Sequence, residues 1–141
     1  MVEPRPVAPQ GTAAALPLPG TAAAAYTAGM EKKSLTALVR RQMETAGQAA
    51  SGRSAVTVYG GHEHILRQTV IALQAGFRLD EHENPGEATV FVLKGRINLA
   101  SGEVSWDGSA GDLLIVPQAR HSVHALEDSA ILLTVAKPQL A

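Results

Sequence analysis

The stretch from Gly52 to Lys137 alternates short β-rich runs with turn-forming residues, and this pattern constrains the fold more than any other feature of the chain. The connections between the runs contain Gly, Asn and Asp, which supply the backbone conformations that chain reversals need. Runs of this length and spacing predict an antiparallel sandwich or barrel. The eight predicted strands cover residues 55–59, 65–73, 89–93, 96–100, 103–106, 113–116, 121–126 and 131–136.

A mixed α/β sheet is the alternative, since residues 90–93 and 113–116 are apolar on both faces. Parallel strands need crossover connections of about a dozen residues or more, and the connections here are shorter. We therefore predict an all-β, antiparallel fold. The outward side of these two runs must be covered by another sheet, a helix or a partner subunit, so self-association is expected.

The first part of the chain has a different composition. Residues 1–29 are rich in Ala and Pro and lack a basic region followed by an unbroken apolar stretch, so they do not match a secretory signal. We expect residues 1–30 to form a disordered tail. Met30 stands directly before the first patterned segment, which suggests the hypothesis that translation begins there.

Residues 31–52 are predicted to form one amphipathic helix and a linker. Ser34 is a candidate N-cap, and Gly47 or Gly52 is a candidate stop. The polar face is basic, and a solvated face on a helix packed against the barrel explains it better than contact with DNA. The apolar residues at helical spacing are Leu35, Leu38, Val39 and Met43.

Composition excludes several classes of function. The formal net charge is −1, which argues against binding along a nucleic-acid phosphate backbone. The chain has no cysteines, which rules out disulfides and thiolate metal sites. No apolar run approaches the roughly 20 residues that span a bilayer. We expect a soluble cytoplasmic protein that binds neither nucleic acid nor membrane.

Histidines are the residue type best suited to carry chemistry. The chain has five: His62, His64, His82, His121 and His124. A single histidine is more often a surface or hydrogen-bonded residue than a ligand, so position must distinguish them. His82 and Asn84 form an i, i+2 pair whose side chains share a direction on extended chain.

Two segments resemble the motifs of the cupin superfamily. Residues 76–95 match the spacing of the first motif, G-x5-H-x-H-x3-E-x6-G, with His82 at its first histidine. Residues 111–121 are similar to the second motif, G-x5-P-x-G-x2-H-x3-N, through Pro117 and His121. The resemblance to small bacterial one-domain cupins implies a double-stranded β-helix, or jelly-roll barrel, over residues 53–137. It also implies a homodimer paired through the sheets.

The motifs depart from the family pattern at the metal-binding positions. Asn84 replaces the second histidine, Ala88 the glutamate and Ala119 a glycine, and the approach to His121 is one residue short. Metal-binding cupins hold their ion with three histidines and a glutamate, so the resemblance implies His82 and His121 as metal ligands.

Two imidazoles and a neutral amide make a poor site for a divalent ion. His64 shares a face with His62 and is the best spare ligand if its segment lines the mouth of the barrel. The cofactor implied is one divalent transition metal (iron, manganese, nickel, copper or zinc), and the alternative is none.

Three residues are candidates for binding a small ligand: Asn84, Gln68 and Arg120. Arg67 and Gln68 are consecutive in a predicted strand, so one of them should point inward. Gln68 shares a face with three apolar residues, Leu66, Val70 and Ala72, and is the inward candidate. Arg120 could attract an anionic ligand.

The sequence leaves three functions open. The leading prediction is a small cupin that binds a small ligand, with or without a metal, at the barrel mouth. The second is a metal-dependent dioxygenase or isomerase, which metal content would distinguish from the first. The third is a regulatory or stress-linked interaction module, supported only by the exposed helix.

Overall fold

The β-rich pattern folds into two antiparallel sheets and one helix in the computed structural model, which describes residues 29–82 and 86–137. The helix is α2 (Leu35–Gln48). The strands are β1 (Arg53–Tyr59), β2 (Leu66–Leu73), β3 (Arg78–His82), β4 (Glu87–Lys94), β5 (Arg96–Ser101), β6 (Val104–Ser109), β7 (Leu113–Val116), β8 (His121–Ala125) and β9 (Ser129–Ala136). Residues 1–28 of the predicted tail lie outside the described residues, and so does the candidate ligand-binding residue Asn84.

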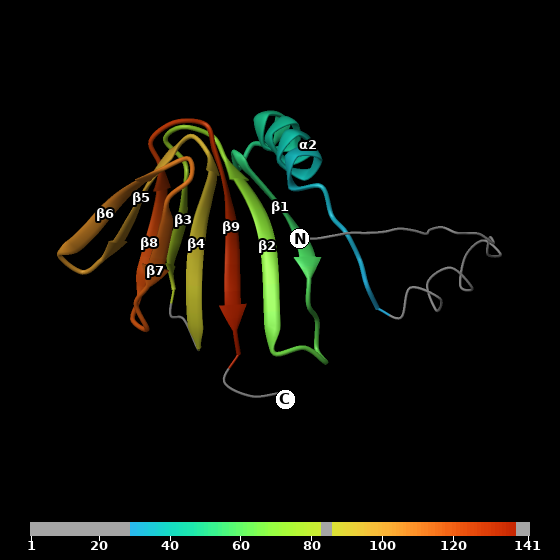
Figure 1. Ribbon diagram of the computed structural model, residues 1–141. Helices are drawn as coiled ribbons and strands as arrows, with labels where there is room; N and C mark the ends of the chain where they lie inside the picture. The colour runs from blue at the N-terminus through green and yellow to red at the C-terminus, as the bar shows by residue number, and fades with distance from the viewer. Residues whose placement is uncertain (1–28, 83–85, 138–141) are drawn as a thin grey trace, which may run out of the picture. The chain divides into compact units, whose positions relative to one another are not determined.

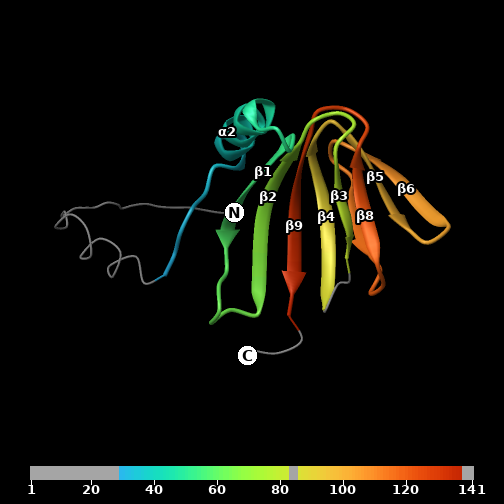
Figure 2. The same ribbon diagram turned by 180° about the vertical axis from the view of Figure 1, so that it is seen from behind.

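The two sheets pack face to face, as Figures 1 and 2 show from opposite sides. The five-stranded sheet has the order β1-β2-β9-β4-β7, and the four-stranded sheet has the order β3-β8-β5-β6. The core between them is aliphatic, as the composition requires. Its larger members are Ile71, Leu73, Val90, Val92, Ile97, Leu99, Val116, Val123 and Ile131. The predicted all-β barrel is confirmed.

The structure has one strand that the sequence pattern does not predict. β3 pairs with β8 through Arg78↔His124 and Leu79↔Val123, and only Leu79 packs against the core. A strand at the edge of a sheet tolerates charged residues, so its sequence carries no apolar run. The eight predicted strands all form, and the described chain has nine in all.

The helix begins where predicted, because the Ser34 side chain accepts a hydrogen bond from the Ala37 amide at 3.2 Å. It ends at Gln48 rather than at either candidate glycine. Its buried residues also differ from the predicted apolar face. Gln42 and Ala46 are buried, whereas Leu35, Leu38, Val39 and Met43 are only half-buried.

The helix covers the outer face of the five-stranded sheet at β1 and β2 (Figure 1). The Ser54 hydroxyl donates a short hydrogen bond to the Gln42 side-chain oxygen. Ser54 is the register partner of Ala72, so Ala72 and Val70 lie under the helix, and both are fully buried. Alternation then places Ile71 and its neighbours on the core side.

None of the helices in the described part of the chain is long and apolar enough to span a membrane.

Candidate functional site

Strand directions bring one set of loops to a single end of the barrel, here called the mouth. The mouth is the end where β3, β7 and β9 finish and where β2, β4 and β8 begin. The register confirms this, since Ala136 pairs with both Leu66 and Glu87, and Ala88 pairs with Val116. The mouth is the lower end in Figure 1, and α2 lies at the upper end.

His121 is the best-defined polar residue at the mouth. It opens β8 and faces the barrel interior with only 4% of its surface exposed, alternating with Ser122 and His124, which are only half-buried. Its Nδ1 lies 3.0 Å from the Ala119 carbonyl oxygen. A carbonyl can only accept, so Nδ1 of His121 carries a proton and donates to Ala119.

His82 is the register partner of His121. The two Cα atoms face each other across β3 and β8, after a register shift that follows Leu79. The side chain of His82 lies outside the described residues, so the pairing concerns the backbone. The structure brings together the two positions that the motif resemblance implies as ligands.

His64 lies in the connection between β1 and β2. Its ring meets Tyr59 edge-on, with centroids 4.9 Å apart, and its Nδ1 is buried without a hydrogen-bond partner. Among the side chains described, over residues 29–80 and 86–137, no three His, Asp or Glu groups lie close enough to hold a metal ion. The described donors therefore do not make up a metal site by themselves.

Gln68 does not point inward. It lies on the same face as Val70 and Ala72, as predicted, but this face is the outer one, covered further along by α2. Its amide nitrogen donates to the Thr134 hydroxyl at 3.2 Å, and Thr134 is its register partner on β9. The predicted orientation of Gln68 is wrong, because the apolar face that it shares packs on the helix and not in the barrel.

Arg67 takes the inner position instead. Its register partner is Val135, which packs against the core, and the next inner residue of β2 is Thr69 opposite Leu133. Arg67 is exposed, and its side chain makes no hydrogen bond or ion pair with any residue that the structure describes. Sequence reasoning missed this residue, although alternation along β2 made it the only other choice.

Arg120 directly precedes His121 in the loop from β7. Its carbonyl oxygen accepts a hydrogen bond of 2.8 Å from the Ser101 hydroxyl at the end of β5. This contact ties the loop that carries both residues to the four-stranded sheet. Arg67, near the start of β2, and Arg120, in the loop between β7 and β8, therefore both lie at the mouth end of the barrel.

Solved structures resemble this chain although no family or curated protein matches its sequence. No protein-family model matches the chain, and no curated protein matches it. A conserved protein of unknown function from Streptococcus pyogenes is 25% identical, with a TM-score of 0.58 over 64% of this chain and 79% of the other.

Two further structures are named as cupins. A cupin superfamily protein from Desulfitobacterium hafniense is 15% identical, with a TM-score of 0.56 over 60% of this chain and 77% of its own. An RmlC-like cupin from Desulfovibrio desulfuricans is 24% identical, with a TM-score of 0.53 over 60% of this chain and 81% of its own. The two sheets, their motifs and these likenesses agree, and the chain is a small protein with the cupin fold.

Proposed function

We propose that the mouth of the barrel binds a small carboxylate ligand, with Arg67 as its charged anchor. The observation that carries the proposal is an arginine on the inner face of β2 whose side chain has no partner among the described residues. A guanidinium binds a carboxylate through two parallel hydrogen bonds, which gives both affinity and orientation.

His121 adds a second recognition element. The bond from its Nδ1 to Ala119 orients the ring, and in the neutral tautomer that donates from Nδ1 the Nε2 atom accepts, which suits a hydroxyl or another donor group on the ligand. The surrounding inner residues, Leu133, Val135 and Val123, are apolar and favour a compact ligand with little other polarity. The class that fits these three features is a small hydroxycarboxylate, and Arg120 strengthens the attraction for its charge.

Titration of the nitrogen-15-labelled protein with lactate, followed by NMR, tests this proposal. Lactamide, which has a similar shape but no charge, is the control ligand. We expect saturable shifts at the mouth for lactate only, and Arg67→Gln should weaken binding roughly tenfold or more. Gln68→Ala, on the outer face, is the control and should change nothing. Equal shifts with lactamide, or an Arg67→Gln variant that binds as the wild type does, would refute the carboxylate anchor.

A metal-dependent dioxygenase or isomerase remains the second candidate, favoured by the pairing of His82 with His121. A histidine that ligates a metal usually donates its other ring N–H to a carbonyl or carboxylate, as His121 does to Ala119. Plasma mass spectrometry on untagged protein, with His82→Ala and His121→Ala beside the wild type, tests it. Near one metal per chain, lost in both variants, supports an enzyme; metal-free protein from replete medium contradicts it.

A further inference from the structure

A second cation lies beside Arg67 at the mouth, just beyond the end of β9. The Lys137 amide donates a hydrogen bond to the Ile65 carbonyl oxygen at 2.9 Å, so the pairing of β9 with β2 continues past the last strand residues. Val135, two positions earlier, packs against the barrel core opposite Arg67. Alternation therefore places Lys137 on the same inner face as Arg67.

The two cations are close neighbours in the register. Arg67 is opposite Val135, and Lys137 is two residues further along the chain, which makes the two cations a cross-strand diagonal pair. Diagonal neighbours on one face of an antiparallel pair lie about 7–8 Å apart, within reach of long side chains. The mouth thus presents two positive charges next to the apolar residues Leu133 and Val135.

One hydrogen bond holds the side chain of Lys137 in place. Its Nζ donates to the Gly61 carbonyl oxygen at 3.0 Å, in the connection between β1 and β2. The preceding residue, Gly60, runs directly alongside β2, since a Cβ there would lie 2.8 Å from the Cα atom of Arg67. The ammonium group is therefore held close to the backbone that carries Arg67.

Neither charge is neutralised by the part of the chain that the structure describes. Lys137 is half-buried and Arg67 is exposed, and neither forms an ion pair with a described residue. An ammonium has three N–H donors, and Gly61 accepts from only one of them. Glu87 pairs with Ala136 on the outer face of the sheet, which is the face opposite to both cations. A half-buried cation without a counter-charge favours an anionic ligand.

We propose that Lys137 binds a second carboxylate, so that the ligand of the mouth is a small hydroxydicarboxylate. The inference rests on the carboxylate anchor proposed for Arg67 and adds the charge of the ligand to it. Arg67 binds one carboxylate through two parallel hydrogen bonds, and Lys137 binds the other as a point charge through the donors that Gly61 leaves free. Two cations at a set separation select a ligand with two anionic groups over a ligand with one.

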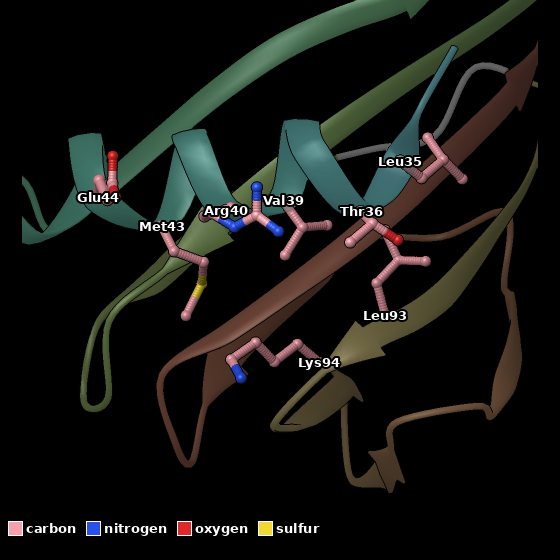
Figure 3. Close-up of a pocket in the computed structure, with 8 residues that line it drawn as sticks. All are labelled: Leu35, Thr36, Val39, Arg40, Met43, Glu44, Leu93 and Lys94. Carbon is pink, nitrogen blue, oxygen red and sulfur yellow. The ribbon is translucent and has the colours of Figure 1, made fainter. Parts of the chain in front are cut away.

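Two cations also lie near each other at the opposite end of the barrel, in a groove of about 510 Å³ between α2 and the end of β4. Figure 3 shows Arg40 on the helix and Lys94 on the strand side of this groove. Glu44 lines the same groove, so a carboxylate there would also meet a negative charge. The mouth is therefore the better site for a dianion, and Lys94 supplies a control cation outside it.

Isothermal titration calorimetry with malate and lactate tests the inference, because malate is lactate with a second carboxylate on the methyl carbon. We expect malate to bind at least about tenfold more tightly than lactate. β-Malamate, in which an amide replaces that second carboxylate, should bind like lactate. Lys137→Gln should remove the advantage of malate and change lactate binding much less. Lys94→Gln removes the same charge from the other end of the barrel and should leave both affinities as they are.

The outcomes separate this inference from the carboxylate anchor. If lactate binds through Arg67 but malate binds no more tightly than lactate, only the second carboxylate site is wrong. A full preference for malate in Lys137→Gln would overturn the role of this lysine. If neither ligand binds, the anchor and this inference fall together. Gln retains an N–H donor for Gly61, and Lys137→Arg retains the charge and should keep most of the preference, so the pair of variants distinguishes charge from anchoring of the loop.

Discussion

His82 and His121 face each other as cross-strand partners at the mouth end of β3 and β8, although 38 positions separate them in the chain. The pairing holds the two cupin-motif histidines at neighbouring backbone positions, while the core beneath them is filled by Leu79 and Val123. Polar residues therefore lie at the mouth, directly above aliphatic core residues. Small-molecule sites are typically built this way, with a few polar groups on an apolar surface.

The tautomer of His121 is a direct prediction of this geometry. Because the Ala119 carbonyl accepts from Nδ1 at 3.0 Å, the neutral ring should carry its proton on Nδ1. Long-range nitrogen–proton NMR spectra of the imidazole distinguish the two tautomers. In spectra of the neutral imidazole, we expect the cross-peak pattern of the tautomer that carries its proton on Nδ1 for His121. A proton on Nε2 would contradict the bond to Ala119 and the role proposed for this ring.

The contact between Gln42 and Ser54 predicts a strongly non-additive pair of substitutions. Ser54→Ala leaves the buried Gln42 oxygen without its partner and should lower the free energy of unfolding by about 1–2 kcal/mol. Gln42→Met combined with Ser54→Ala removes both polar groups and should recover most of that loss. Urea unfolding of the two single variants and the double variant measures the coupling. Additive losses would show that the bond contributes nothing to the stability of the helix on the sheet.

Ser129 predicts a second stability effect at the start of β9. Its buried hydroxyl accepts from the Arg96 amide at 3.0 Å and lies 2.9 Å from the Arg96 carbonyl oxygen and 2.7 Å from that of Glu127. Ser129→Ala leaves the Arg96 amide unpaired and should cost about 1–3 kcal/mol in thermal or urea unfolding. Ser105→Ala, at an exposed position of β6, is the matched control and should cost almost nothing. Equal effects would refute the role of this hydroxyl.

The fold could be predicted from the sequence because turn residues and aliphatic runs report strand positions directly. β3 escaped prediction because an exposed edge strand needs no apolar alternation, and Leu79 alone is too short a signal. Six of the eight predicted strands carry buried side chains, while β1 has none and β6 buries only Gly108, so turn residues and β-rich composition marked these two. A charged edge strand with a single core residue gives neither signal.

The candidate site was harder to predict than the fold. Residues 66–73 are apolar on both faces, one against the barrel core and one against α2, so alternation separated Arg67 from Gln68 without saying which was inside. Only the packing of α2 on Ser54 and Ala72 resolves this choice. The helix was ambiguous for the same reason. Val39 and Met43 matched the apolar face that the sequence predicted, but Gln42 is the residue that the structure buries against the sheet.

The glycine after β4 predicts a clear difference in stability between two substitutions at positive-φ positions. Gly95 has a φ of +81°, and a Cβ there would lie 2.4 Å from both the Asp128 carbonyl oxygen and the Ser129 hydroxyl. Gly102, in the β5–β6 turn, has a φ of +61°, but a Cβ there would meet no other atom within 4 Å. Gly95→Ala must strain the backbone and also displace the β9 entry, so it should cost about 3 kcal/mol or more.

The Gly102→Ala variant separates these two costs. It carries the backbone strain alone and should lose only about 1–2 kcal/mol in urea unfolding. If both variants lost the same free energy, the close approach of Gly95 to β9 would be absent in solution. A larger loss at Gly95 would show that this turn has no room for a side chain beside the start of β9, because the Asp128 carbonyl and the Ser129 hydroxyl already fill the space.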